Sequence, residues 1–270
     1  MKSAALWFVV LLALPVVAFA EGPTEAHLSY ETYAAGLHVA EVDAGVGLGA
    51  SGYQIELAYH TTGITSVFLH GHQYDSVSGN WSGLAPRPSL FAAQGLWHGE
   101  PRVARIEYDE GMPVIRELTP PNNEEREPVP GALQRNTIDT VSALAQLLHT
   151  VEQTGRCDAT VRTFDGRRLV EVRAMTVGEE MLRPSSRSIF AGKALRCDFS
   201  GHLVAGFKLG DDRDRQARPL NGSAWLAPLG LGGAALPVRM TFQTRWVGTA
   251  TMYLTAAGTG AGIEAAERQQ

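Results

Sequence analysis

Apolar and polar positions alternate along most of the chain in short runs that glycines separate. From residue 28 to 118 these runs are rich in β-branched and aromatic residues, which is typical of half-buried antiparallel strands. The clearest run extends from Tyr53 to Tyr59 and has an apolar side chain at every second position, so one face is expected to be buried and the other solvated. This half of the chain is expected to contain strands at 28–34, 37–42, 53–60, 64–70 and 103–108.

One stretch, 137–151, has a helical period instead. Thr137 or Asp139 is available to cap its amino end, and Gly155 follows as a residue that commonly ends helices. The apolar stripe predicts that this helix packs against a face of the sheet. The stripe consists of Ile138, Val141, Leu144, Leu148 and Val151.

Strand patterns return after the helix and predict three hairpins. The first is expected to turn at Asp165-Gly166, a dipeptide favoured where a hairpin needs positive φ. The second is expected to turn at Ser200-Gly201 and the third at Gly248. The paired strands are 159–164 with 168–176, 187–199 with 203–209, and 238–246 with 249–255.

Other segments have neither period. The stretch 119–131 contains four prolines among charged and amide residues, so we expect an exposed loop without strand or helix. A second, charged loop is expected at 211–215. From residue 256 onward the chain is small and polar, which predicts a flexible tail.

The first twenty residues have the form of a secretory signal peptide. Lys2 precedes an apolar run that ends in Ala18-Phe19-Ala20, a small-x-small cleavage site. The run is shorter than the roughly 20 apolar residues that span a bilayer, which argues against a transmembrane anchor. Because no cysteine follows the cleavage site, we expect the mature chain to begin at Glu21 as a soluble, unlipidated periplasmic protein.

Length and charge limit the organisation and the partners. Removal of the signal peptide leaves about 250 residues, which suits a single β-rich domain. We therefore expect a signal peptide at 1–20, one domain at 21–255 and a tail at 256–270. The formal net charge of −5 and the scattered arginines argue against nucleic acid as a partner.

The chain has two cysteines, Cys157 and Cys197, and both lie in the part expected to be exported. Thiols in that compartment are normally oxidised, so the pair is expected to form a disulfide. A redox-active pair would need C-x-x-C proximity or an activating environment, and the sequence shows neither.

Two motifs resemble cofactor or metal sites. Gly47 to Gly52 has the letters of a dinucleotide-binding fingerprint, but a strand rather than a helix follows, so we expect a hairpin loop and no nucleotide cofactor. His70 and His72 would point to one side of a strand, where His60 or His98 could join them at a zinc ion. Spacing alone is a weak signal, so surface histidines are favoured and no metal is expected.

The sequence lacks a G-x-S-x-G elbow that would mark a nucleophilic serine. No enzyme is therefore expected. The aromatic residues carry the main binding hypothesis: core packing explains them most simply, whereas the sharper interpretation is an apolar cavity or cleft that takes an amphiphile. The expected ligand-binding residues are Trp81, Phe91, Trp97, Trp225 and Trp246.

The order of a few short motifs carries a family resemblance. The motifs are YAAGLHVA from Tyr33, IDTVSAL from Ile138, FDGRR from Phe164, and RCD from Arg196 followed by Gly206-Phe207. Together, over about 28–255, they resemble the DUF3108 family of exported bacterial envelope proteins. The resemblance implies kinship in shape with LolA, LolB and RseB. The implied fold is mainly β, a strongly curved antiparallel sheet or incomplete β-barrel, with the helix against its concave side and no catalytic residues to carry over.

These observations predict a non-enzymatic periplasmic protein that binds a lipid, an acylated protein or another amphiphile in cell-envelope maintenance. An envelope adaptor that binds a protein partner through an edge strand or the proline-rich loop remains the alternative. An uncharacterised hydrolase is the third possibility.

Overall fold

The computed structural model describes residues 25–63, 71–244 and 248–260. The expected signal peptide, the strand expected at 64–70 and most of the expected tail lie outside these residues. The described helices are η1 (Asn122–Glu124), α2 (Gly131–Gln134), α3 (Thr140–Thr154) and α4 (Arg213–Ala217). The strands are β1 (Glu25–Ala34), β2 (Leu37–Leu48), β3 (Gly52–Thr61), β4 (Gly71–Ser82), β5 (Ala85–Trp97), β6 (Glu100–Asp109), β7 (Met112–Thr119), β8 (Ala159–Phe164), β9 (Leu169–Leu182), β10 (Gly192–Ala205), β11 (Leu220–Pro228), β12 (Ala235–Thr244) and β13 (Gly248–Thr259).

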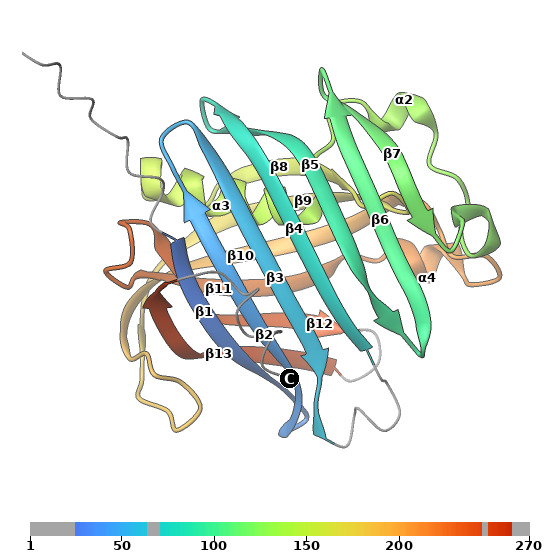
Figure 1. Cartoon of the computed structure of the whole chain (residues 1–270). Helices are drawn as coiled ribbons and strands as arrows, with labels where there is room; N and C mark the ends of the chain where they lie inside the picture. Colours follow the sequence, from blue (N-terminus) through green and yellow to red (C-terminus); the bar gives the residue numbers. More distant parts are fainter. Residues whose placement is uncertain (1–24, 64–70, 245–247, 261–270) are drawn as a thin grey trace, which may run out of the picture.

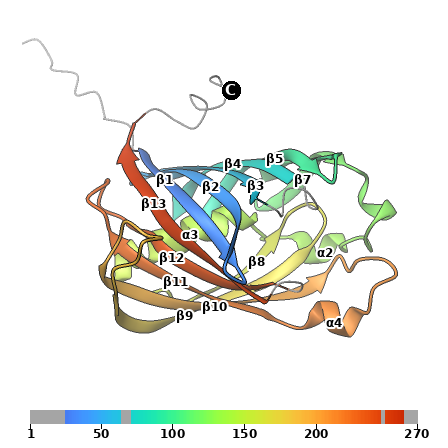
Figure 2. The same ribbon diagram turned by 90° about the horizontal axis from the view of Figure 1, so that it is seen from below.

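All described strands belong to one 13-stranded antiparallel sheet in the order β7-β6-β5-β4-β3-β2-β1-β13-β12-β11-β10-β9-β8. The first and last described strands, β1 and β13, therefore pair in the middle of the sheet, and the described sheet ends at β7 and β8 without closing. Figure 1 shows β1 to β7 in front of β8 to β13. Figure 2 shows that the two halves face each other with α3 between them. The expected curved, incomplete barrel with a helix on its concave side is confirmed.

Alternation along the strands produces the single apolar face that this arrangement needs. In β1, every second residue from Ala26 to Ala34 is buried, and the residues between them are partly exposed. In β3, Tyr53 and Ile55 are buried, as their apolar spacing predicts. The glycine-rich stretch 47–52 forms the hairpin turn between β2 and β3, where the Gly49 N–H donates to the Gly52 carbonyl at 2.9 Å.

The described strands β7 and β11 lie outside the predicted strands, and so do β4 and β5, which had no clear strand signal in the sequence. β4 and β5 are rich in serine, glycine and proline, residue types that strands disfavour. The pairing tolerates them because its register shifts between Ser78 and Gly79, which places Gly79 opposite Pro88. A Cβ at Gly79 would lie 2.6 Å from the Arg87 carbonyl oxygen, so only glycine allows this close approach of the two backbones.

The hairpin expected at Ser200-Gly201 is wrong. β10 runs unbroken through both residues, and they pair on one side with β9 and on the other with β11. Backbone hydrogen bonds to the strands on both sides outweigh the turn preference of this dipeptide. β11 itself lacked a recognised signal because it contains Asn221-Gly222. The hairpin expected at Asp165-Gly166 is confirmed. The pairing expected on either side of Gly248 is also confirmed, but Gly248 is already paired with Thr244, and residues 245–247 between the two strands lie outside the described residues.

Helix α3 begins three residues later than the apolar period predicts. Asp139 is its N-cap and accepts from the Ser142 N–H at 2.7 Å. Ile138 lies outside the helix and forms a parallel bridge to Thr163, which covers part of the free edge of β8. At the other end, Gly155 adopts φ 67° and donates to the Val151 carbonyl, as expected of a glycine that ends a helix.

The expected disulfide between Cys157 and Cys197 is confirmed, with a Cα–Cα distance of 5.9 Å. Both cysteines are fully buried. The bond ties the chain directly after α3 to β10 and so fixes the carboxyl end of the helix on the sheet. For a loop of this length, the chain-entropy account assigns about 4 kcal/mol of stabilisation.

The two edges of the sheet approach each other at the turn between β8 and β9. Asp165 accepts from the backbone N–H groups of Arg167 and Arg168 at 2.9 and 2.7 Å, which shapes the turn. The Arg167 side chain then donates to the Thr119 carbonyl at the end of β7, at 2.6 Å. This contact bridges the open side of the barrel and gives the FDGRR motif a structural role.

The proline-rich segment is more ordered than expected. It contains η1, and Arg126 forms a backbone bridge with Lys208. The Arg126 side chain also donates to the Gly206 carbonyl at 2.9 Å, while Val129 is buried in the core. The expectation of a fully exposed loop without helix is therefore wrong. The prolines prevent regular strand hydrogen bonds, and these long-range contacts hold the segment on the sheet instead.

The structure also corrects the predictions for the charged loop and for the start of the tail. The charged loop at 211–215 contains the start of α4, whose N-cap Asp212 accepts from the N–H groups of Asp214 and Arg215. The tail expected from 256 starts later, because β13 continues to Thr259 and its last residues pair with β1.

Gly206 lies under the β8–β9 turn and generates a testable prediction. Its φ is +82°, and a Cβ there would clash with the Arg167 carbonyl oxygen. Gly210 has a similar φ of +76°, but a Cβ there would have nothing within 4 Å, so this position isolates the cost of the backbone conformation. We expect Gly210→Ala to lower the unfolding free energy by about 1 kcal/mol and Gly206→Ala by about 3 kcal/mol. Urea unfolding measures both, and equal losses would contradict the clash.

Candidate binding surfaces on the two faces of the sheet

Cys197 identifies the concave face, because its disulfide partner directly follows the enclosed helix α3. Side chains alternate along β10, so Phe199 lies on the concave face and Asp198 on the convex face. Directly paired residues share a face, which extends the assignment to the neighbouring strands. Ser223 pairs with Asp198 and is convex, whereas Gly222 pairs with Phe199 and is concave.

Helix α3 covers one part of the concave face. The Tyr53 hydroxyl and the Ser142 hydroxyl are hydrogen bonded at 2.7 Å. Trp81 stacks on His149 with ring centroids 4.0 Å apart. Ala145 on the helix has no exposed surface. This part of the concave face is therefore filled by the helix.

A buried carboxyl group lies at the start of α3. Burial raises the pKa of Asp139 to about 6, although hydrogen bonds from Ser142 act in the opposite direction. Burial also raises the pKa of Tyr108, and the nearby Asp139 adds to that shift. Asp139 thus combines helix capping with a carboxyl group that is easily protonated.

The rest of the concave face is partly exposed. Along β3, Ile55 is fully buried, but Leu57 and Tyr59, which follow on the same face, are not. Along β12, Val238 is fully buried, whereas Met240 and Phe242 are partly exposed. We call this region the uncovered half. It comprises Val42, Leu57, Tyr59, Asp75, Ala93, Phe199, Met240, Phe242 and Met252.

One carboxyl group lies within this apolar region. Asp75 on β4 accepts a hydrogen bond from the Gln73 amide at 2.7 Å. Burial raises the pKa of Asp75 to about 6, and the Gln73 hydrogen bond partly offsets that rise. Burial, with a further contribution from Asp75, also raises the pKa of Tyr59. The uncovered half thus offers an apolar surface with one carboxyl group.

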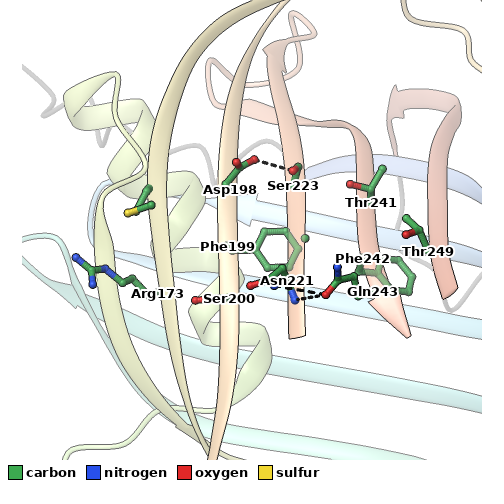
Figure 3. Close-up of a pocket in the computed structure, with 12 residues that line it drawn as sticks. Arg173, Asp198, Phe199, Ser200, Asn221, Ser223, Thr241, Phe242, Gln243 and Thr249 are labelled. Atoms are coloured by element: carbon green, nitrogen blue, oxygen red, sulfur yellow. Dashed lines mark hydrogen bonds between the residues drawn. The ribbon is translucent and has the colours of Figure 1, made fainter. Parts of the chain in front are cut away.

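A hollow of about 380 Å³ extends across β9 to β13 (Figure 3), and its lining combines convex side chains such as Asp198 with Phe199 and Phe242, which belong to the concave face. Ser223 donates to Asp198 at 2.6 Å, and the Asn221 amide approaches the Gln243 oxygen at 3.4 Å. Arg173 lies at one side of the hollow. These groups can exchange hydrogen bonds with a ligand, and Met175, Phe199 and Phe242 add apolar surface to the same hollow.

Trp225 lies beside this hollow, also on the convex face. The guanidinium groups of Arg196 and Arg239 lie 5.4 and 5.6 Å from its ring centroid. Its indole N–H donates to Glu180 at 2.8 Å. These contacts leave Trp225 only 7% exposed, so it serves to pack the charged residues of this face.

The structure places the predicted aromatic residues on both faces of the sheet. Trp81 packs on α3, Phe91 is buried in the core, and Trp225 lies on the opposite face. Trp97 is 38% exposed at the end of β5, where the register places it on the concave face, opposite Gly71 and close to Tyr59. Trp246 lies outside the described residues. Of the four that are described, Trp81, Phe91 and Trp97 therefore share the concave face and Trp225 does not. Residue type alone cannot show which face of a strand a side chain occupies. The alternation in β3 could have identified Leu57 and Tyr59, because it predicts which residues share the buried face.

The histidines expected at the surface are only partly described. His72 is exposed on β4 and pairs with His60 across the ladder, while His70 lies outside the described residues. In the described parts of the chain, no three His, Cys, Asp or Glu side chains gather as they would around a metal ion.

Asp139 generates a prediction about pH. Its pKa of about 6 in the folded protein exceeds its ordinary value of 3.8, so the folded state binds the proton more tightly. This contribution to stability is complete below about pH 4 and is lost as the pH rises through 6. The unfolding free energy of the wild-type protein should therefore fall between pH 4 and pH 8. Asp139→Asn keeps a capping oxygen but cannot titrate, so we expect this fall to be smaller in the variant by up to about 3 kcal/mol. Urea unfolding at both pH values measures this difference, and an unchanged pH profile would refute it.

Comparison with solved structures supports the fold. The crystal structure of a β-barrel-like protein of the domain of unknown function DUF1849 from Brucella abortus matches with a TM-score of 0.53. The match covers 89% of this chain and 100% of that chain at 11% sequence identity, so it supports the fold alone. A β-barrel-like relative is consistent with the expected kinship in shape to LolA, LolB and RseB.

Comparison of sequences identifies the family. No curated protein matches the chain significantly. Residues 29–255 match a family described as "Protein of unknown function (DUF3108)", which covers nearly all of the sheet and α3. The motifs that carry the resemblance shape the β8–β9 turn, the start of α3 and the disulfide. The chain belongs to the DUF3108 family.

Proposed function

We propose that this protein binds a lipid, an acylated protein or another amphiphile on the uncovered half of the concave face. The observation that carries the proposal is the change in exposure along single strands, from fully buried Ile55 to partly exposed Leu57 and Tyr59. Apolar side chains that face inward yet remain accessible are suited to an apolar ligand. The match to a β-barrel-like fold supports a binding role.

We further propose that the protein acts in the periplasm and is not an enzyme. The signal-like segment at 1–20 and the disulfide between Cys157 and Cys197 support export. Among the described helices, none has the length and apolar character needed to cross a membrane. An amphiphile-binding role requires no reacting group, and the buried carboxyl group of Asp139 is accounted for by helix capping.

An adaptor role for a protein partner is the second candidate. β7 lies at an edge of the sheet, and its Ile115 side chain is 39% exposed. An edge strand presents free backbone groups that an extended peptide can pair with. Cross-linking in cells tests this role, since an adaptor predicts one dominant protein adduct and an amphiphile carrier does not.

Leu57 and Val177 form a matched pair for testing the amphiphile. Leu57 lies in the uncovered half, whereas Val177 is 55% exposed on β9, outside that region. Burying a leucine contributes about 1.5–3 kcal/mol, so we expect Leu57→Gln to weaken binding of the neutral probe N-phenylnaphthylamine about 10-fold or more. Val177→Gln should leave the affinity unchanged. Fluorescence titration measures both.

Lipid extraction provides a control that needs no variant. Protein purified without detergent should release an amphiphile into organic solvent, and native mass spectrometry should show the corresponding added mass. A protein that binds no probe and releases no amphiphile would argue against the proposal.

A further inference from the structure

Asp75 is an unusual residue for its position. It lies on the concave face of β4, where the next residue inward on the same face is Val77, which is 2% exposed. Its cross-strand partners are Leu57 on β3 and Ala93 on β5, and both are apolar. A carboxyl group in this setting loses much of its hydration, and neither of these cross-strand partners can donate a hydrogen bond to it from its side chain.

The described surroundings do not compensate a negative charge on Asp75. Its one described hydrogen bond comes from the neutral Gln73 amide. The charged groups that act on it are the carboxylates of Asp139 at the start of α3 and Asp165 in the β8–β9 turn, both of which raise its pKa further. Tyr59 on β3 also faces it and carries no positive charge. No cation from the described part of the chain is among the groups that act on Asp75.

A half-buried carboxylate without a counter-ion is unfavourable unless a ligand supplies the opposite charge. Asp75 lies within the apolar region where an acyl chain would pack, between Leu57 and Ala93, so a cation on the same ligand would meet it. We propose that the amphiphile bound on the uncovered half carries an amine or ammonium headgroup and that Asp75 is the counter-ion of that group. This inference rests on the proposed function and specifies the chemistry of its ligand.

Three probes with the same decyl chain test the inference on the wild-type protein. Decylammonium, decanol and decanoate share an apolar tail and differ in headgroup charge, and calorimetry below their micelle concentrations gives each affinity. A hydrogen bond to a charged group contributes about 1.5–3 kcal/mol, so at pH 8 decylammonium should bind about 10-fold more tightly than decanol. Decanoate should bind more weakly than decanol, because Asp75, Asp139 and Asp165 repel it.

Asp75→Asn assigns this preference to one residue. The asparagine oxygen can still accept from Gln73, so the local hydrogen bond survives while the charge is removed. We expect the variant to bind decylammonium and decanol with equal affinity. Asp43→Asn is the matched control, because Asp43 also accepts one side-chain hydrogen bond, from Ser29 at 2.6 Å, but lies on the convex face of β2. It should keep the wild-type preference.

The outcomes separate this inference from the proposed function. If decanol and decanoate bind as tightly as decylammonium, or if Asp75→Asn keeps the preference, the headgroup assignment is overturned while amphiphile binding stands. If none of the three probes binds, both proposals fail. The wild-type comparison remains decisive even if Asp75→Asn does not fold.

Discussion

The structure depends on the attachment of α3 to the concave face of one very wide sheet. Thirteen antiparallel strands turn their apolar sides inward, and residues such as Ile55 and Leu28 would be exposed without a covering element. The helix is held at both ends: Asp139 caps its start beside the β8 edge, and Cys157 bonds to β10 just after its end. A covalent bond and a buried cap make its position a fixed part of the fold.

The same constraint leaves a surface available for binding. α3 has 15 residues and is about 22 Å long, whereas strands of 12 residues such as β2 and β4 extend about 40 Å. One helix of this length cannot cover the whole face. Leu57 and Met240 lie beyond it, on opposite halves of the sheet, and remain partly exposed. The contact between Arg167 and Thr119 meanwhile joins the open edges of the sheet, so the curvature that shapes this region is maintained at the far side.

The sequence predicts elements where local preference and tertiary position agree. The alternation in β3, the Asp165-Gly166 turn and the Gly155 helix end are correct because nothing else in the described fold opposes them. Prediction fails where neighbours outweigh preference. β10 passes through Ser200-Gly201 because strands on both sides supply its hydrogen bonds. For the candidate site, choosing residues by aromatic character selected Trp225, which lies on the other face. It overlooked Asp75, whose importance depends on burial and on the absence of a cation among the described groups around it.

By itself, the sequence determined the strand-rich class, the amphipathic helix, the cysteine pair and the family resemblance, because periodicity, residue type and motif order are properties of local chain segments. Only the tertiary structure decided that the first and last described strands pair, how far α3 extends over the concave face, and which side chains remain accessible there. Those features follow from long-range register and packing, which bring together residues such as Thr119 and Arg167 that are distant along the chain.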